Sequence, residues 1–453
     1  MNTLVRQQRK YFSTHATKDL KFRLEQLKKF QNVLKSNEKL LYEAIYKDFK
    51  KSEFETFTAE LSLLYHDIKE ARKELHNWAR VKRVKTSMLN FPAKSYIIPE
   101  PLGVCLVIGA WNYPYGLSLA PVIAAMAAGN TVLIKPSEIS KNTSAVMAKL
   151  INENFSPNYL KVVEGGIPET TDLLNQKFDK IFFTGSPQVG KIVYQAAAKN
   201  LTPVTLELGG KSPAFVTEAC NLKMTVKRLV WAKFLNAGQT CIAPDYILVH
   251  QSIEKKFLKL MKAEIEKEHF SFENENYTQI INDRNLERLS KLIDSEKVYF
   301  GGEINASDRY IQPTIMQGVT YEDSVMKEEI FGPILPVISY TDLEDAIQQV
   351  NALDKPLSCY VFTSSKKQKN KILSDISFGG GAINDAVMHI ANSQLPFGGV
   401  GNSGLGSYHG EAGFKTFSHY KSIMEKSNLI ELPLKYYPRT KGKLAWIKRF
   451  MKF

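Results

Sequence analysis

Apolar and polar positions alternate along the first 80 residues with the spacing of amphipathic helices. In LKFRLEQLKKF, residues 20–30, apolar side chains recur every three or four positions between charged ones, which places them on one face of a helix. The later segment MLNFPAKSYIIPEP, residues 88–101, has β character and three prolines. Because prolines interrupt regular packing, we expect this segment to leave the body of the molecule.

From residue 103 the pattern changes to apolar strands that alternate with helices. The predicted strands are GVCLVIGA, NTVLIKP, LKVVEG, KIFFTG and PVTLELGG. Strands that are apolar throughout are typical of a parallel sheet covered by helices on both faces. A second alternation, with YILVH, PILPVISY, LSCYVFT and GGAIND as its strands, follows from residue 211. The pattern therefore predicts an α/β protein with a doubly wound domain and a second α/β domain.

The composition is that of a globular protein and excludes several classes. Hydrophobic residues make up 44% and charged residues 23% of the 453 positions, without the low-complexity tracts of a disordered chain. No apolar stretch reaches the ~20 residues of a membrane-spanning helix, and the N-terminal stretch lacks the apolar core of a secretion signal. We therefore expect a cytoplasmic protein.

Charge and cysteine content argue against nucleic acid, disulfides and metal. The net charge of +14 comes from lysines scattered over predicted helices among glutamates, without a recognisable basic module for nucleic acid. The four cysteines are far apart and form no CxxC pair or cluster with histidine. We therefore expect neither a disulfide nor a metal site.

The C-terminal stretch KGKLAWIKRFMKF, residues 441–453, has a pattern of its own. Leu444, Ile447, Phe450 and Met451 recur at helical spacing among basic residues. Such a helix can make a weak contact with an anionic membrane surface or pack across a dimer, and both uses stay open.

Two glycine-rich segments compete for the role of a phosphate-binding loop. Gly399, Gly401 and Gly404 match GxGxxG, but no acidic residue ends a second strand about 20 residues further on, as a dinucleotide fingerprint requires. We interpret this segment as a structural loop. TGSPQVGK, residues 184–191, instead follows a predicted strand and opens a helix whose first turn suits Pro187.

Polar residues after two further segments could add to a nucleotide site. In KPSE, Lys135 and Glu138 lie three residues apart after a strand and could bind the two hydroxyls of a ribose. A surface turn with the carboxylate near a helix N-terminus is the alternative. In EEIFGP, residues 328–333, we expect Glu329 and Phe331 on opposite sides of an extended segment.

Three residues suggest nucleophilic chemistry. Cys241 lies in NAGQTCIAPD between an amphipathic run and an apolar strand, and none of the eight histidines is within eight residues of it. A small buried thiol is the alternative for a lone cysteine. Glu207 ends the apolar strand of PVTLELGG, where desolvation suits a carboxylate to general-base work, unless it faces solvent from an edge strand. Asn112 in WNYP has an amide that could donate to an oxyanion.

Taken in order, these motifs resemble those of the aldehyde dehydrogenase superfamily. The resemblance runs from about residue 100 to 406 through WNYP, KPSE, FTGSPQVG, LELGGK, GQTC, EEIFGP and PFGGVGNSG. The short N-terminal region, SGLGSYHGEAGFKTFSHYKS (403–422) and the tail resemble class 3 of that superfamily. Each motif alone is weak, but seven in sequence make coincidence negligible.

The resemblance implies a role for each matching position. Cys241 corresponds to the nucleophile and the start of a helix, Glu207 to the general base, and Asn112 with the Cys241 N–H to the oxyanion hole. The implied cofactor-binding residues are Trp111, Lys135, Glu138, Phe183, Gly185, Ser186, Gly190, Leu208, Gly209, Glu329 and Phe331. Tyr65, Tyr113 and His389 are candidates for the lining of the substrate pocket.

The implied reaction is oxidation of aromatic or medium to long aliphatic aldehydes to carboxylic acids with NAD or NADP. Thiolate attack gives a thiohemiacetal, hydride passes to the nicotinamide, and water hydrolyses the thioester. A CoA-acylating or semialdehyde dehydrogenase on the same fold is the closest alternative. A thiol hydrolase and a non-catalytic binding protein are more distant ones.

The resemblance also implies the domain organisation and a homodimer. Residues 1–84 and 101–207 would form the NAD(P)-binding domain and residues 208–392 the catalytic domain. Residues 85–100 and 393–453 would form a small bridging β element and tail that connect two subunits.

Overall fold

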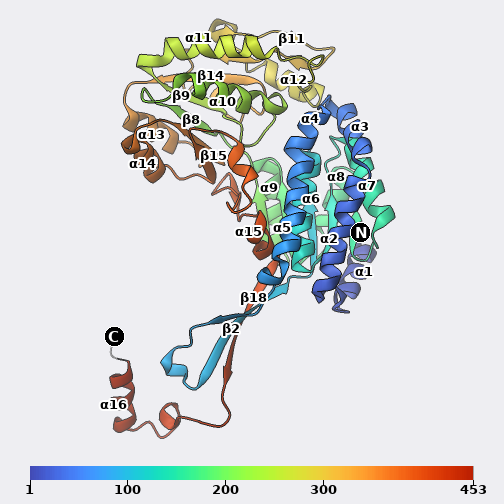
Figure 1. The fold of residues 1–453 in the computed structure, drawn as a ribbon, viewed down its shortest axis with the longest axis vertical. Helices are drawn as coiled ribbons and strands as arrows, with labels where there is room; N and C mark the ends of the chain where they lie inside the picture. Colours follow the sequence, from blue (N-terminus) through green and yellow to red (C-terminus); the bar gives the residue numbers. More distant parts are fainter. Residues whose placement is uncertain (452–453) are drawn as a thin grey trace.

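The N-terminal region is a layer of helices against the rest of the first domain. The structure, a computed structural model, describes residues 1–451. The helices are α1 (Asn2–Phe12), α2 (Leu20–Lys35), α3 (Glu38–Phe49), α4 (Glu53–Thr56) and α5 (Ser62–Trp78), with a π-helical turn (Phe57–Leu61) between the last two. Their apolar stripes are buried, with Phe30 1% exposed, so the predicted amphipathic helices are confirmed (Figure 1).

The first sheet has the six-strand order β17-β7-β6-β3-β4-β5. Its strands are β3 (Val104–Ile108), β4 (Thr131–Lys135), β5 (Leu160–Val162), β6 (Lys180–Thr184), β7 (Val204–Glu207) and β17 (Gly404–Leu405). All pairs are parallel except that of β17 with β7. Every residue of β3, β4 and β6 is buried, as expected for a sheet with helices on both faces.

Four helices connect the strands of this sheet. They are α6 (Pro114–Ala128), α7 (Lys141–Asn154), α8 (Ile167–Leu174) and α9 (Pro187–Ala198). Pro121 lies inside α6 and both α8 and α9 carry proline in the first turn. The α6 helix is buried along most of its length, which explains why it is apolar throughout rather than amphipathic.

The second sheet has the seven-strand order β10-β13-β14-β9-β8-β15-β16, parallel except for β10. The strands are β8 (Pro213–Val216), β9 (Tyr246–His250), β10 (Val298–Phe300), β13 (Thr314–Met316), β14 (Ile334–Tyr340), β15 (Ser358–Phe362) and β16 (Gly380–Ile383). Its helices are α10 (Leu222–Phe234), α11 (Gln251–Glu268), α12 (Asp283–Ser290), α13 (Leu343–Asn351) and α14 (Lys366–Asp375), and a small hairpin pairs β11 (Ile304–Asn305) with β12 (Tyr310–Ile311). The α/β fold with two parallel-sheet cores is thus confirmed.

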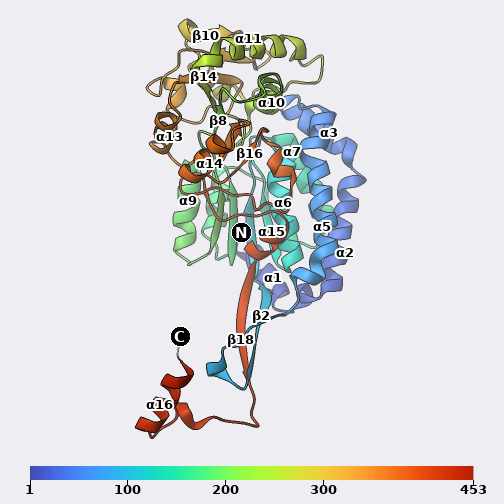
Figure 2. The same cartoon turned by 60° about the vertical axis from the view of Figure 1, so that its left-hand side comes forward.

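A three-stranded antiparallel ribbon leaves the body, as predicted for residues 88–101. It has the order β1-β2-β18, with β1 at Lys82–Val84, β2 at Ala93–Pro101 and β18 at Ser418–Lys426. The β2 and β18 strands pair over nine residues each. Figures 1 and 2 show the ribbon extending below the body and leading to α16 (Lys441–Phe450).

The C-terminal segment divides differently from the predicted 393–453 unit. The strand β17 pairs with β7 in the first sheet, and α15 (Gly410–Thr416) packs on α6 so closely that a Cβ on Gly413 would lie 3.0 Å from that of Ala124. Residues 404–417 therefore belong with the first domain, and only residues from β18 onward extend away. The predicted tail helix is α16; residues 452–453 and the Phe450 side chain of that prediction lie outside the described part. Among the described helices, none is long and apolar enough to cross a membrane.

Candidate active site

Cys241 lies on a turn between α10 and β9, not at the start of a helix as the resemblance implied. The chain leaves α10 through Asn236 and Ala237, both with positive φ, and Gly238 follows at φ 71°. A Cβ on Gly238 would lie 2.3 Å from the Gly332 carbonyl oxygen, so glycine is required there. The left-handed residues turn the chain sharply, and Cys241 is left partly exposed.

Glu207 ends β7 inside the first sheet. It is 3% exposed and its strand pairs on both sides, with β6 through Thr184 and with β17 through Gly404. The edge-strand alternative is therefore wrong. Neither carboxylate oxygen has a hydrogen-bond partner among the described residues, and burial raises the pKa of Glu207 well above its usual value. A carboxyl group in this environment holds or accepts a proton readily.

The thiol of Cys241 shares its environment with two buried carboxyl groups. Burial, then the nearby Glu329 and Glu207, raise the pKa of Cys241 to about 12, against two backbone N–H groups that lower it. Burial likewise raises the pKa of Glu329 to about 8. A neutral thiol must lose its proton before it can act as a nucleophile. A neighbouring carboxyl group of raised pKa, in its ionised form, is a suitable acceptor.

The Asn112 amide is held in a fixed orientation near the nucleophile turn. Its Nδ2 donates to the Gln239 carbonyl oxygen at 3.1 Å, two residues before Cys241. The backbone carbonyl oxygen of Asn112 accepts from Asn236 Nδ2 at 3.0 Å. An amide nitrogen has two N–H groups, so a second N–H remains for another acceptor.

The segment after β6 turns directly into the start of α9. Ser186 caps α9 by accepting from the Val189 N–H, and a Cβ on Gly185 would lie 2.6 Å from the Phe183 ring. A Cβ on Gly190 would lie 2.7 Å from Leu208, which lets α9 approach β7. Its N-terminal N–H groups are suited to a diphosphate.

The competing GxGxxG segment is a structural loop. Its Gly401 and Gly404 pair with each other, and the Leu208 N–H donates to the Ser403 carbonyl oxygen at 3.1 Å. These contacts hold β17 against the strand that ends in Glu207. The interpretation made from the sequence therefore agrees with the structure.

Among the remaining predicted cofactor residues, Lys135 ends β4, Gly209 follows the end of β7 and Glu329 lies in the segment before β14. Lys135 is buried and its ammonium contacts Glu138 at 3.1 Å, so the carboxylate that would accept from a ribose is already fixed. A Cβ on Gly209 would overlap the Glu329 carboxylate. A nucleotide with a ribose, a diphosphate and a planar ring fits this set of groups.

The segment around Phe331 is not the extended one that we expected. Phe331 has φ 50°, in the left-handed region, and its ring lies 5.4 Å from that of Trp111 in an edge-on arrangement. Because the backbone turns at Phe331, Glu329 and Phe331 do not follow the alternation of a strand. Arg288 holds this turn by donating to the Ile330 carbonyl oxygen at 2.6 Å.

The three candidate pocket residues differ in their surroundings. The Tyr113 hydroxyl shares a hydrogen bond with Thr240 at 2.7 Å, next to Cys241. His389 lies 5.9 Å from the Tyr360 ring, and neither of its ring nitrogens has a partner among the described residues. Tyr65 instead donates to Glu38 at 2.7 Å, and none of its described contacts is with the site.

Several residues that hold the site were not predicted from the sequence. Lys51 and Glu60, from the N-terminal helices, contact the loop of Asn112. Lys211 contacts Asp245, whose other oxygen accepts from the Ile330 N–H. No motif marks these residues, because their partners are distant in sequence.

Comparisons with known proteins match one family over most of the chain. The model of the aldehyde dehydrogenase family matches residues 1–423. The 4,4'-diaponeurosporen-aldehyde dehydrogenase of Staphylococcus aureus is 47% identical over 98% of this chain and 97% of that protein. The dimeric NADP-preferring aldehyde dehydrogenase of Rattus norvegicus is 44% identical over 97% of this chain and 98% of that protein. The solved structure titled "Substrate bound state of Staphylococcus Aureus AldH" has a TM-score of 0.97, with 46% identity over 99% of both chains.

Proposed function

The chain belongs to the aldehyde dehydrogenase family, and from this premise we propose that it oxidises aldehydes to carboxylic acids through a thioester on Cys241. It is an oxidoreductase that uses NAD or NADP. The observation that carries the cysteine mechanism is geometric: the Asn112 amide is bonded at 3.1 Å to Gln239, two residues before Cys241, and the buried Glu207 carboxyl has no partner among the described residues.

The chain's own residues account for the proton transfers and the charge. The Cys241 thiol gives its proton to an ionised carboxyl group near it, for which Glu329 and Glu207 are the candidates, and that proton passes on to solvent. The sulfur attacks the aldehyde carbon, and the free Asn112 N–H with the Cys241 backbone N–H donates to the oxygen that becomes negative. Collapse with loss of hydride to the cofactor would leave a thioester on Cys241, and Glu207, as the carboxylate, then takes a proton from the attacking water.

The nicotinamide cofactor supplies the hydride acceptor. Lys135 and Glu138 would hold a ribose, the start of α9 at Ser186 the diphosphate, and Glu329 with Phe331 the nicotinamide end. Gly185 and Gly190 support this, since a side chain at either would collide with its neighbours.

Glu207 also favours water over coenzyme A as the acyl acceptor. Water needs a base to attack a thioester, whereas a thiol of coenzyme A is a good nucleophile by itself. A buried carboxyl without a partner supplies that base. CoA-acylating and semialdehyde dehydrogenation are therefore the less favoured alternatives.

The proposed substrates are aromatic or medium to long aliphatic aldehydes. Tyr113, bonded to Thr240 next to Cys241, and His389, beside Tyr360, support aromatic groups in the proposed pocket. An aldehyde panel read as NADH or NADPH absorbance at 340 nm tests the function. We expect turnover of benzaldehyde and hexanal without added coenzyme A; turnover that requires coenzyme A would favour the acylating alternative.

We also infer a homodimer in the cytoplasm, formed through the ribbon. The outer edge of β18 is unpaired in its sheet and Met424 on it is 51% exposed, which supports pairing with a second copy. Four unpaired cysteines suit a reducing compartment.

For the tail we propose packing across that dimer, with contact to an anionic membrane as the second use. Leu444 is 51% exposed on α16, next to a basic last turn. Co-sedimentation with phosphatidylserine vesicles, against a chain that ends at Leu434, distinguishes them. Equal pelleting of both chains would leave only the packing role.

A further inference from the structure

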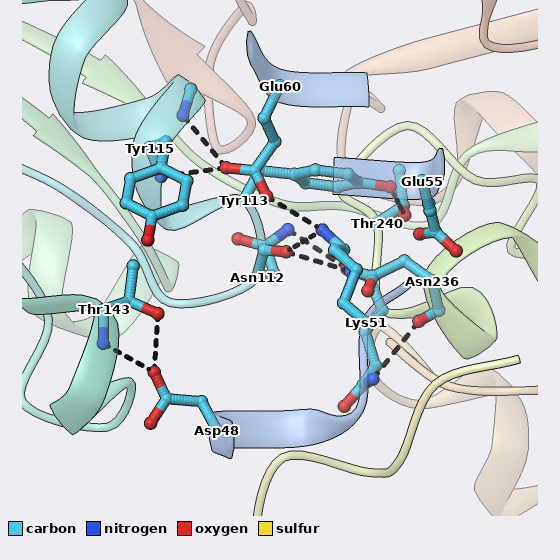
Figure 3. Close-up of polar contacts among 12 residues, drawn as sticks. Asp48, Lys51, Glu55, Glu60, Asn112, Tyr113, Tyr115, Thr143, Asn236 and Thr240 are labelled. Carbon is cyan, nitrogen blue, oxygen red and sulfur yellow. Dashed lines mark hydrogen bonds and ion pairs between the residues drawn. The ribbon is translucent and has the colours of Figure 1, made fainter. Parts of the chain in front are cut away.

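Lys51 is a fully buried lysine in the short link between α3 and α4. Its side chain is 0% exposed and its ammonium contacts Glu60 at 3.1 Å. The same ammonium donates to the Asn112 carbonyl oxygen at 3.0 Å and lies 3.9 Å from the centre of the Tyr113 ring. Figure 3 shows Lys51 between Glu60 and the loop of Asn112. One buried ammonium group therefore contacts Glu60, the Asn112 backbone and the Tyr113 ring.

Glu60 fixes the other end of that loop. It lies in the π-helical turn between α4 and α5, and its second oxygen accepts from the Tyr115 and Gly116 N–H groups at 2.8 and 3.0 Å. These are free N–H groups in the first turn of α6. The carboxylate therefore caps the helix that begins immediately after Asn112 and Tyr113.

Glu55 is a second carboxyl group near the cation, but it has no hydrogen bond to Lys51 among the described residues. Burial raises the pKa of Glu55 to about 7, against Lys51, which lowers it, and the neighbouring Glu60 adds to the rise. One of its oxygens has no partner among the described residues. Glu60 is therefore the carboxyl group that Lys51 contacts directly, and Glu60 also receives two N–H groups.

A buried ion pair adds little net stability, because desolvation offsets its attraction. The effect of the ion pair is to fix the orientation of the groups that it contacts. The backbone carbonyl oxygen of Asn112 accepts from Lys51 and Asn236, and its side-chain amide donates to the Gln239 carbonyl oxygen. Tyr113, under the ammonium, bonds to Thr240 beside the nucleophile.

We propose that Lys51 and Glu60 are positioning residues that align the Asn112 amide with the oxygen that becomes negative during attack by Cys241. The inference rests on the proposed function of Asn112 as an oxyanion donor. Lys51 touches neither substrate nor cofactor; it acts through the Asn112 carbonyl.

The first test uses acyl transfer from p-nitrophenyl acetate, which forms the same kind of oxyanion at Cys241 without a cofactor. We expect Lys51→Met to slow the burst of p-nitrophenolate by about 10- to 100-fold, since loss of a whole oxyanion donor costs about 10²–10³-fold. The KM for the ester should change by less than about threefold, because Lys51 does not contact it.

Arg23→Met is the matched control. Arg23 is also a buried cation that donates to backbone carbonyls, among them Ala127 at the far end of α6. Its loss should lower the thermal midpoint as Lys51→Met does but leave the burst rate within about twofold. Equal burst rates in the two variants would overturn the proposal and leave a role in stability.

A double-mutant cycle separates positioning from a general weakening of the fold. If Lys51 acts through the Asn112 amide, Lys51→Met should change the burst rate by less than about twofold in an Asn112→Ala background. A full 10-fold or larger loss in that background would contradict the proposal.

Glu60→Gln replaces Lys51→Met if that variant does not fold. It keeps the shape and one acceptor, and we expect a burst about fivefold slower or more; an unchanged burst would refute the inference. A wild-type chain that is acetylated by the ester but oxidises no aldehyde would instead refute the proposed function alone.

Discussion

At the scale of single residues, the site depends on a thiol that is neutral at rest. Burial and the carboxyl groups of Glu329 and Glu207 raise the pKa of Cys241 to about 12, so the free thiol is a poor nucleophile at pH 7. This differs from cysteines activated by a permanent cation. Reactivity should therefore follow the protonation of the nearby carboxyl groups.

Replacement of Cys241 by alanine should separate chemistry from binding. We expect Cys241→Ala to lose aldehyde oxidation by at least about 10³-fold, because no thioester can form. Binding of NADH, followed by its fluorescence, should stay within about twofold, since the thiol does not hold the dinucleotide. Residual oxidation above a few per cent would show that another group is the nucleophile.

Glu207→Gln should separate the two halves of the reaction. If Glu207 activates the water, the thioester should form and wait, giving a burst of NADH near one equivalent per site and turnover slowed by about 10²–10⁴-fold. Stopped-flow absorbance at 340 nm measures both phases. Loss of the burst would mean that Glu207 is also needed to deprotonate Cys241, and normal turnover would point to Glu329.

Glu138 should discriminate weakly between the two cofactors. Its carboxylate would repel a 2′-phosphate, but it is 48% exposed and paired with Lys135 at 3.1 Å, so its effective charge is reduced. We expect Glu138→Gln to raise the ratio of kcat/KM for NADP over NAD by about 3- to 10-fold. An unchanged ratio would show that another group sets the preference.

At the scale of elements, the sequence predicted the strands and helices whose pattern lies within a single segment. The apolar strands β3, β4, β6 and β7 and the helix after TGSPQVGK were predicted because strand or helix patterns lie within each segment. The short strands β8, β10 and β13 were not, because PAFV, VYF and TIM are too short to show a period. Only a partner distant in sequence makes them strands.

The same distinction applies to the candidate site. Cys241, Glu207 and Asn112 stand in motifs with a chemical meaning, whereas Lys51 and Glu60 stand in no motif. Their role depends on contacts with residues 61 and 55 positions further on. Tyr65 was a candidate for the pocket because it is aromatic, but its hydroxyl donates to Glu38. A residue type alone does not show which way a side chain points.

The ribbon should hold two copies together through β18. We expect Tyr420→Glu with Met424→Glu to weaken the dimer by at least about 100-fold, because two charges would be buried without partners. Light scattering during gel filtration gives the mass. Lys255→Glu, an exposed change on α11, is the control; a dimer that persists in the double variant would place the interface elsewhere.

At the scale of the whole molecule, two half-buried histidines link stability to pH. Burial lowers the pKa of both His389 and His409 to about 4, and the rings of both stack against Phe397. The unfolded chain binds protons at these positions below pH 6.5, while the folded chain stays neutral until about pH 4. Their contribution is therefore present above pH 6.5 and is lost as the pH falls toward 4.

Urea unfolding at pH 7.5, 6 and 5 measures this loss. We expect the urea midpoint to fall steadily with pH. The free energy of unfolding should fall by up to roughly 1–2 kcal/mol per histidine between pH 6.5 and 5. His389→Phe should flatten part of this dependence, because phenylalanine does not titrate. An identical slope in wild type and variant would show that other groups control acid stability.

The strand that closes the first sheet sets an order for synthesis of the chain. Residues Gly404 and Leu405 pair with the strand that ends in Glu207, and a ribosome adding about 5–20 residues per second makes them roughly 10 to 40 seconds later. Until then the nascent domain carries an open sheet edge of the kind that recruits other chains. Premature termination before residue 404 should therefore yield a product that lacks this cover and requires a chaperone.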